Sequence, residues 1–419
     1  MRKMKDSGVA WLSEIPENWQ VVPPKALFRL RKDKAAPGDH QLTASQQHGI
    51  IYQDNYMALT GNRVVTVEKD FSILKRVEKG DFVISMRSFQ GGLEYSENAG
   101  SISSAYVMLV PNLEYIVPEF YKWLFKSPTY ITALQCTSNL IRDGQALRYN
   151  NFVQVPLCII PKDEQKKIAR TLGEKCQKID ALIANVQAQI EKLKAYKQSV
   201  VREAVTKGLK PHAPMKESGI EWIGQIPCDW KVLASKWLMR KTKTIREKYS
   251  GESVLSLTTK GVITRDLDNP SGKMPATFDG YQFVEAGNLL MCLFDIDVTP
   301  RCIGLIKNDG VSSPAYSQFK LNGLADAEYY YYYYLSLDYT KELLHLAKNL
   351  RHSLTEEQFG AIPTVLPPME TQKEIAAYLN KKCADIDRVL EIKQAKIEKL
   401  EQYKRSLIYE YVTGKKEVS

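Results

Sequence analysis

Two long stretches of the chain, residues 159–210 and 365–419, carry apolar residues at every seventh position. The first stripe and the second, which Lys393 interrupts, consist of Leu172, Ile179, Val186, Leu193 and Val200, and of Leu379, Ile386, Leu400 and Leu407. A stripe spaced by ~3.5 residues over about five heptads is typical of coiled coils. Prolines before each stretch and acidic residues at its start favour helices of ~40–45 residues, or ~60–67 Å. Because neither stripe is wide enough for a bundle core, we expect the two helices to pack on each other.

The segments 24–158 and 234–364 show a different pattern, in which short β-rich runs alternate with turn residues. The runs at 81–85 and 288–292 predict buried strands, and the aromatic runs at 120–125 and 329–334 predict helices. A helix with tyrosines all round must bury several of them, so we favour core packing over base stacking for the second run. The sequence therefore predicts a mixed α/β fold.

Both kinds of segment occur twice. The opening motif SGxxWxxxIPxxW at residues 7–19 recurs 211 positions later, and the proline- and glutamine-containing motif at 156–169 recurs 207 positions later. A period of about 210 residues is far too long for a solenoid. It indicates two copies of a domain-plus-helix unit, with the two helices in an antiparallel coiled coil and the copies related by a pseudo-twofold axis. The two strands of a DNA site share that symmetry.

The 44% apolar content is globular, and the net charge of +10 with a pI near 9.0 favours a polyanionic partner. Residues 162–210 carry a net +6 and residues 369–419 a net +2. The remaining parts are only slightly basic, so DNA binding there would depend on local loops.

The chain lacks the motifs of familiar catalytic sites. The sequence has no CxxC, HExxH, GxxxxGK[ST] or GxGxxG, and no [DN]PP[YF] tetrapeptide of amino-methyltransferases. The ExK triplets at 164–166 and 391–393 lie on the predicted helices, where solvated charges are the ordinary interpretation. Unpaired cysteines and the lack of long apolar runs lead us to expect a reducing, cytoplasmic setting without a membrane span.

These motifs together resemble the specificity (S) subunit of type I restriction-modification systems, over essentially the whole chain. The resemblance rests on the repeated opening, the PxxxxPxxEQxxIA motif before each helix (Thr371 replaces Glu164 in the second copy), and the segments 80–91 and 293–301. It implies target-recognition domains at 1–158 and 211–364, each reading half of a bipartite site on double-stranded DNA. The helices at 159–210 and 365–419 would set the spacer between the half-sites.

The resemblance also implies partners. The helices would dock two methyltransferase (M) subunits, which bind S-adenosylmethionine, and two restriction (R) subunits, which use ATP and magnesium, would join them. The chain itself would be non-catalytic and would bind no cofactor or metal.

Base recognition requires side chains that reach base edges, such as Arg for guanine and Gln or Asn for adenine. In each copy we select two polar loops that the repeat places at equivalent positions. The candidates are Gln46, Gln47, His48, Arg87, Ser88 and Gln90 in the first copy and Thr258, Thr259, Lys260, Asp295 and Arg301 in the second. The alternatives are structural: Ser88 and Asp295 could cap turns, and Arg301 could pair with Asp295 or Asp297. The repeated tryptophans at 11, 19, 222 and 230 are expected in the core, because readers of different sequences should differ.

Two rival functions stay open at this point. One is a self-sufficient DNA-modifying enzyme with a built-in reader, against which the missing motifs count. The other is a coiled-coil scaffold whose globular domains bind no DNA.

Overall fold

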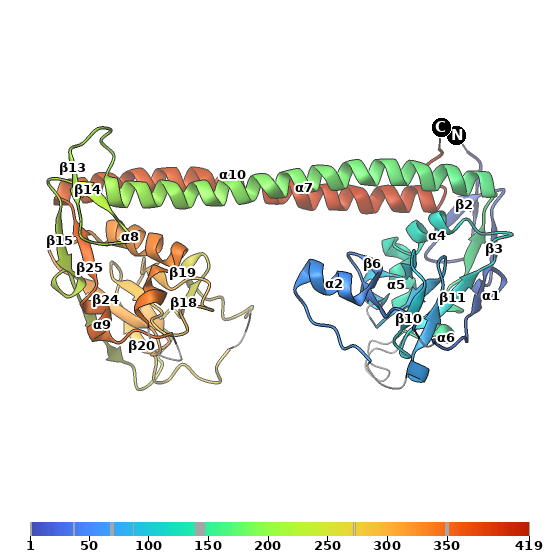
Figure 1. Ribbon diagram of the computed structural model, residues 1–419, viewed down its shortest axis with the longest axis horizontal. Coiled ribbons are helices and arrows are strands. Elements are labelled where there is room, and N and C mark those ends of the chain that lie inside the picture. The colour runs from blue at the N-terminus through green and yellow to red at the C-terminus, as the bar shows by residue number, and fades with distance from the viewer. Residues whose placement is uncertain are drawn as a thin grey trace. The chain divides into compact units, whose positions relative to one another are not determined.

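The computed structural model describes residues 2–36, 38–67, 71–86, 88–138, 147–270, 272, 274–347 and 352–418. The chain divides into two compact units. Unit 1 comprises residues 1–187 and 395–419, and unit 2 comprises residues 188–394. Each unit therefore contains one globular domain and one half of each long helix (Figure 1).

The globular part of unit 1 is built from short strands and helices. Its strands are β1 Met4–Asp6, β2 Glu14–Pro16, β3 Gln20–Val22, β4 Phe28–Leu30, β5 Leu42–Ser45, β6 Gly49–Tyr52, β7 Lys75–Val77, β8 Phe82–Ile84, β9 Glu94–Tyr95, β10 Gly100–Ile102, β11 Val107–Pro111 and β12 Leu157–Ile159. Its helices are α1 Pro24–Leu27, α2 Gln53–Thr60, α3 Ser88–Gly91, α4 Pro118–Leu124, α5 Pro128–Gln135 and α6 Tyr149–Phe152, with a 3-10 turn η1 at Phe71–Ile73.

Unit 2 repeats much of this order. Its strands are β13 Met215–Glu217, β14 Gln225–Pro227, β15 Lys231–Ala234, β16 Met239–Thr242, β17 Thr244–Ile245, β18 Leu255–Thr258, β19 Gly261–Thr264, β20 Gln282–Val284, β21 Leu289–Met291, β22 Ile303–Leu305, β23 Gly310–Ser312, β24 Ser317–Leu321 and β25 Pro363–Leu366. Its helices are α8 Ala327–Thr340 and α9 Glu356–Gly360, with 3-10 turns η2 Ser235–Trp237 and η3 Glu342–Leu346.

The two central sheets have the same topology. Strand order is β4-β11-β8-β9 in unit 1 and β16-β24-β21-β22 in unit 2, with antiparallel neighbours throughout. The predicted buried strands are confirmed as β8 and β21, the inner strands of these sheets. Each domain adds a hairpin, β5-β6 or β18-β19, above a small second core. The predicted mixed α/β fold and its duplication are therefore confirmed.

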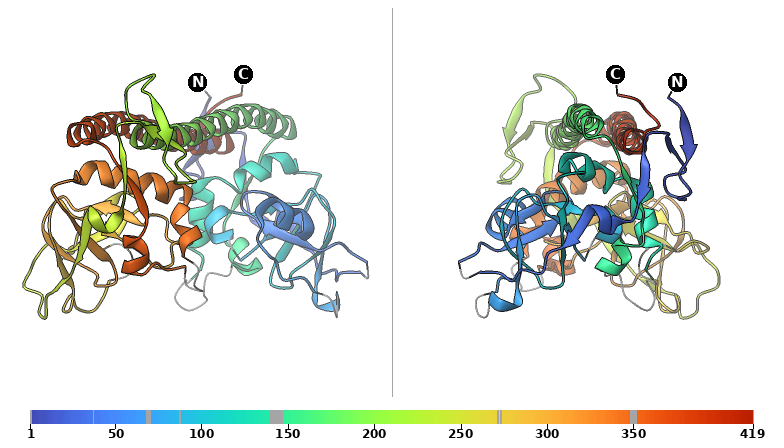
Figure 2. Two further views of the ribbon diagram at one scale, coloured as in Figure 1. Left: turned by 60° about the vertical axis from the view of Figure 1, so that its left-hand side comes forward. Right: turned by 90° about the vertical axis from the view of Figure 1, so that its right-hand side faces the viewer.

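The long helices are α7 Lys162–Lys207 and α10 Met369–Val412. In unit 1, Lys404 on α10 forms an ion pair with Asp180 on α7 at 2.7 Å. In unit 2, Lys197 on α7 pairs at 2.7 Å with Asp387 on α10, the same two motif positions with the helices exchanged. The helices run antiparallel and side by side, as both views of Figure 2 also show. The predicted antiparallel coiled coil is confirmed.

The predicted stripe lies along this helix pair. Six of its residues are buried and three are half-buried. The buried ones are Leu172, Ile179, Val186, Leu379, Ile386 and Leu407, and the half-buried ones are Leu193, Val200 and Leu400. Cys176 and Cys383 are also buried there, and burial raises the pKa of both thiols. In each half of the seam, a cysteine side chain therefore packs between two residues of the seven-residue stripe.

A buried glutamine fixes the start of each long helix to its domain. The Gln165 amide donates to the backbone oxygens of Tyr115 and Ile160 and accepts from Val117 N–H at 2.7 Å. Gln372 makes the equivalent bonds in unit 2. The repeated glutamine motif is therefore structural, since its side chain satisfies backbone groups where a loop meets a helix.

The aromatic helices α4 and α8 lie between the central sheet and the long helices in their units (Figure 1). Tyr121 donates to the carbonyl of Cys158, and Tyr330 donates to that of Val365, which marks the two helices as equivalent. The tyrosine run of α8 is buried except for half-buried Tyr331, so the expected core role is confirmed. Trp11, Trp19 and Trp230 are likewise buried, and Trp222 is half-buried.

Candidate nucleic-acid interface

The first predicted loop of each copy is the tip of a hairpin. In unit 1, β5 and β6 are joined by Gln46, Gln47 and His48, and all three side chains are exposed. The Ser45 hydroxyl accepts bonds from the N–H groups of Gln47 and His48, and Gly49 has φ +67°, a conformation that favours glycine. The turn is held by its own backbone and serine, which leaves the three tip side chains facing solvent.

The hairpin of unit 2 is one residue shorter. Thr258 pairs with Gly261 in the strand register, and Thr259 and Lys260 form the exposed tip. The Thr258 hydroxyl donates to Gly261 O at 3.0 Å and accepts from Lys260 N–H at 3.1 Å. Thr258 is therefore half-buried and engaged in the turn, whereas Thr259 and Lys260 are presented.

The second predicted loop lies beside the hairpin in both units. In unit 1 this facing loop is α3, residues 88–91, and the Gln46 side chain lies so close to Gly91 that a Cβ there would be 2.7 Å from its amide nitrogen. In unit 2 the facing loop is residues 295–301, and Nη1 of Arg301 lies 3.8 Å from an ideal Cβ on Gly261. The fold thus brings together loops that are separated by about 40 residues in the sequence.

The facing loop of unit 1 modifies the predicted set. Ser88 is buried, and its hydroxyl accepts the Ser85 N–H at 2.8 Å, so it holds the turn and does not face solvent. We correct the prediction accordingly and leave Ser88 out of the interface. Gln90 is exposed, and Arg87 lies outside the described residues.

Two side chains behind this loop fix its backbone. Lys126 donates to Gly91 O at 2.9 Å and forms an ion pair with Glu94, and Gln135 donates to Phe89 O. Burial raises the pKa of Glu94, although the neighbouring Lys126 opposes the shift. The Lys126–Glu94 ion pair therefore supports the loop, and nothing in the sequence pattern predicts it.

Arg301 in unit 2 is held by an aromatic side chain. Its Nη1 donates to the Tyr331 hydroxyl at 3.2 Å, and the residue lines a hollow of about 770 Å³ together with Lys260 and Lys307. Neither Lys307 nor Tyr331 was predicted, because neither belongs to the two loops. Lys307 follows β22 and Tyr331 lies on α8, and sequence spacing alone does not place these elements at the site.

The predicted alternatives for the acidic residues of this loop are resolved in part. Asp297 pairs with His352 at 2.9 Å, and its pKa is lowered by the hydrogen bond from His352. Asp295 is exposed and has φ +47°, at the sharp bend that starts the loop. Among the described residues, the Arg301 guanidinium is hydrogen-bonded to Tyr331.

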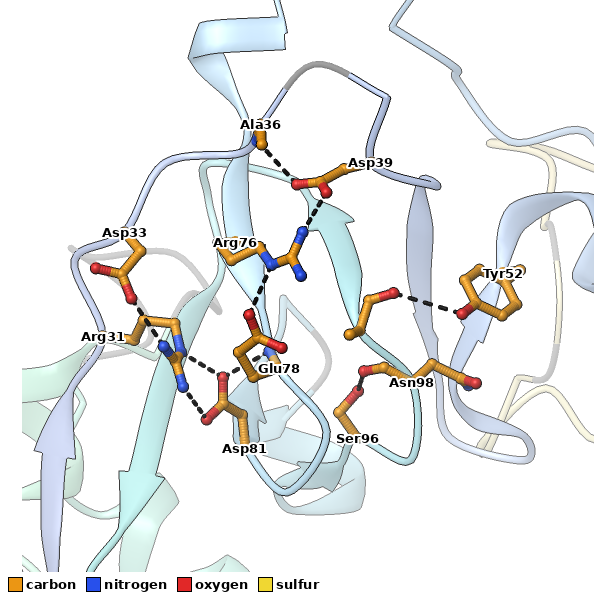
Figure 3. A network of polar contacts seen from close by, with 11 residues as sticks. Arg31, Asp33, Ala36, Asp39, Tyr52, Arg76, Glu78, Asp81, Ser96 and Asn98 are labelled. Atoms are coloured by element: carbon orange, nitrogen blue, oxygen red, sulfur yellow. Dashed lines mark hydrogen bonds and ion pairs between the residues drawn. The ribbon is translucent and has the colours of Figure 1, made fainter.

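Charged side chains of unit 1 form a network around Arg31 and Arg76 (Figure 3). Arg31 makes two bonds to the buried Asp81 carboxylate, at 2.6 and 3.0 Å, and a third to Asp33. Arg76 bridges Asp39 and Glu78. Hydrogen bonding to Asp81 raises the pKa of Arg31, and the Asp81 carboxylate also accepts the Glu78 N–H, so the start of β8 is fixed.

The part of the chain that the structure describes contains no cluster of three or more His, Cys, Asp or Glu suited to a metal ion. Glu164, from one of the ExK triplets, accepts a bond from Trp19 Nε1 at 3.1 Å and pairs with Arg2. Among the described helices none combines the length and apolarity needed to span a bilayer.

Comparisons with known proteins agree with this arrangement. Residues 299–402 match the family model of the type I restriction modification DNA specificity domain. The chain is 24% identical to the MjaX type I restriction enzyme specificity subunit of Methanocaldococcus jannaschii, over 96% of this chain and 95% of that protein. It is 26% identical to the MjaVIII specificity subunit of the same organism, over 63% of each.

The fold also matches a solved structure. A chain from work on complex assembly and conformational transition of the type I R-M system superimposes with a TM-score of 0.67 at 12% identity, covering 95% of this chain and 98% of the other. The duplicated domains and the antiparallel helices agree with this fold match, and in sequence the chain is similar to type I restriction enzyme specificity subunits.

Proposed function

We propose that this chain is the non-catalytic subunit that gives a type I restriction-modification complex its DNA sequence specificity. Each unit reads one half of a bipartite site through its hairpin tip and facing loop. The long helices set the spacing between the half-sites and dock methyltransferase subunits. Restriction subunits join that assembly.

The observation that carries the proposal is a shared fold with different side chains at one place. Both units bring a hairpin tip and a facing loop together over equivalent sheets. The tip is Gln46-Gln47-His48 in one unit and Thr259-Lys260 in the other. Counting from the equivalent register positions Glu94 and Gly304, Gly91 corresponds to Arg301. Such variation is what two readers of different half-sites require.

The exposed groups have the chemistry of base edges. Glutamine amides pair with adenine N6 and N7, arginine pairs with guanine O6 and N7, and a carboxylate accepts from the cytosine amine. We therefore assign Gln46, Gln47, His48, Gln90 and Arg87 to one half-site, and Thr258, Thr259, Lys260, Asp295 and Arg301 to the other. Thr258 contributes chiefly by shaping the tip.

The chemistry belongs to the partners in this proposal. S-adenosylmethionine is bound by the methyltransferase subunits, and ATP and magnesium by the restriction subunits. Because the chain carries no catalytic motif that we could identify in its sequence, the purified chain should not methylate or cleave DNA when supplied with these compounds.

A domain exchange tests the proposal. Residues 24–158 are replaced by the equivalent segment of another specificity subunit, and the complex with the methyltransferase subunit is analysed by sequencing methylated sites. We expect one half-site to change while the other half-site and the spacer persist. If both half-sites are unchanged, the globular domains do not read the DNA and a scaffold role is favoured. Methyl transfer by the chain alone would favour the self-sufficient enzyme.

A further inference from the structure

A segment of unit 1 outside the two predicted loops forms a second wall beside the hairpin. Helix α2 follows β6 directly and ends at Gly61, which has φ +70° and donates its N–H to Met57 O at 2.9 Å. The Thr60 hydroxyl accepts the Asn62 N–H. The chain then turns back as residues 61–67, which we call the strap.

Within the described ranges, the strap is not paired with a neighbouring strand. Instead, two glutamine side chains hydrogen-bond to it. The Gln41 amide donates to Val67 O at 2.7 Å and accepts from Val67 N–H at 2.9 Å. The buried Gln53 accepts from the Thr66 hydroxyl at 3.0 Å and donates to Val65 O at 3.5 Å. Gln41 directly precedes β5 and Gln53 is the first residue of α2, so the strap is fixed to the chain on both sides of the hairpin.

Between strap and hairpin lies a groove of about 560 Å³ that is lined by both polar and apolar side chains. Thr43, Ser45 and Gln46 line it from the hairpin, and Asn62 and Arg63 line it from the strap. Asn62 and Arg63 are exposed, so their side chains are available to a ligand in the groove. Amide, hydroxyl and guanidinium groups around one hollow match the donors and acceptors of base edges.

Unit 2 has a different structure at this place. After β19 the chain enters a turn in which Asp266 accepts the N–H groups of Asp268 and Asn269. The described residues between β19 and β20 contain no helix. The helix-and-strap segment is therefore a feature of unit 1 that the described part of unit 2 lacks. Such a difference is expected for a segment that determines which DNA sequence is recognised, and not for one that maintains the shared fold.

We propose that Arg63, with Asn62 beside it, reads bases of the half-site assigned to unit 1, with the strap as a third recognition element alongside the hairpin tip and facing loop. The inference rests on the proposed function and extends it. Arg63 contacts a guanine through both O6 and N7, and the Asn62 amide reads an adjacent adenine.

The test compares three arginine variants in complex with the methyltransferase subunit. Arg63→Ala removes the side chain. Arg63→Lys keeps its charge but loses the two-pronged geometry. Arg29→Ala is the matched control, because Arg29 is an exposed arginine on β4 of the same domain that does not line the groove. Methylated-site sequencing and competition binding with single-base variants of the site are the measurements.

We expect both Arg63 variants to lose about 10- to 100-fold selectivity at one base pair of one half-site. The other half-site should be unchanged, and Arg29→Ala should match the wild type. Asn62→Ala should relax a neighbouring position. Because Arg63 is exposed, its replacement should leave thermal unfolding unaltered.

Two results would overturn the inference. One is unaltered selectivity in Arg63→Ala. The other is a sequence-independent loss of affinity in Arg63→Ala that Arg63→Lys restores, which marks a phosphate contact. The domain exchange separates this failure from failure of the proposed function. If the exchange changes one half-site while Arg63→Ala does not, only the strap proposal is wrong.

Discussion

The central sheets of the two units have the same topology, but different polar side chains pair at equivalent positions. In unit 1, Arg31, which directly follows β4, pairs with buried Asp81. Strand register places Thr242 and Asn288 at these positions in unit 2. There the Asn288 amide donates to the side-chain oxygen of Gln318 at 3.1 Å. Gln318 stands at the position that Met108 occupies in unit 1. An ion pair beside an apolar side chain thus corresponds to a neutral amide pair.

The support of the facing loop differs in the same way. Counting from the equivalent tyrosines Tyr121 and Tyr330, Lys126 corresponds to Leu335, and its partner Glu94 corresponds to Gly304 by strand register. A Cβ at Gly304 would lie 2.6 Å from Val262, so the unit 2 hairpin sits directly on that strand. The comparison shows that sheet order is retained while the facing loop of each unit has its own support.

Lengthening both long helices should separate spacing from reading. Seven residues are inserted in α7 after Gln187 and seven in α10 after Gln394, which keeps the heptad phase. The insertion adds ~10.5 Å, or about three base pairs at ~3.4 Å each. We expect methylation at the original sites to disappear and both half-sites to persist with a longer spacer, as read by methylome sequencing. The original spacer with full activity would show that the helices do not set the distance.

Equivalent substitutions in the helix seam should lower the free energy of unfolding of the two units by the same amount. Leu172→Ala and Leu379→Ala each remove a fully buried side chain, and each should destabilise its own unit by ~2–5 kcal/mol. Hydrogen exchange, which resolves the units, measures both, and Leu182→Ala at an exposed α7 position is the control. Clearly unequal costs would mean that the helix pair is not packed equivalently in the two units.

Breaking the ion pair of unit 1 should cost more than breaking the amide pair of unit 2. Asp81→Ala leaves the Arg31 guanidinium, whose side chain is only 14% exposed, paired with the exposed Asp33 alone among the described residues, at a cost of ~3 kcal/mol. Asn288→Ala should cost ~1–2 kcal/mol. Hydrogen exchange of β8 and β21 is the measurement.

A transplant sharpens this result. The triple variant Arg31→Thr, Asp81→Asn and Met108→Gln installs the unit 2 residues in unit 1 and should recover most of the loss in Asp81→Ala. If it is no more stable than Asp81→Ala, the two networks are not interchangeable, and the surrounding residues have adapted to each.

Salt dependence should show the smallest difference. Lys307 lines the hollow beside Arg301, and Glu97 is its counterpart by register. Lys307→Ala should reduce the slope of log K against log salt by ~0.9 if it neutralises one phosphate. Glu97→Ala should not reduce that slope. DNA binding at several salt concentrations is the measurement, and an unchanged slope in Lys307→Ala would place this lysine away from the DNA.

Features that repeat along the chain were predictable because they obey a period. The apolar sevens identified the helix pair, and the repeated glutamine motif marked where each long helix begins, although not why. The hairpin tips were found because polar, turn-forming residues stand between two short β runs. Each of these signals lies within a few residues, where local geometry decides the outcome.

Contacts between distant segments were not predictable. Lys126 supports Gly91 from 35 positions away, and Tyr331 holds Arg301 from 30 positions away. Such roles depend on which helix packs over which loop, and neither composition nor period encodes that.

Unit 1 is assembled from both ends of the polypeptide, whereas unit 2 is one uninterrupted segment. Trp19 contacts Glu164 at the start of α7, and a Cβ at Gly414, just beyond α10, would lie 3.0 Å from the same indole. During synthesis, residues 188–394 leave the ribosome before residues 395–419 do. Unit 1 therefore begins to be translated before unit 2 but completes its core after it, and until then the seam around Leu172 lacks Leu407 and Val412. The nascent chain passes through a stage with one finished reader and one exposed apolar stripe, where chaperone binding or degradation would act.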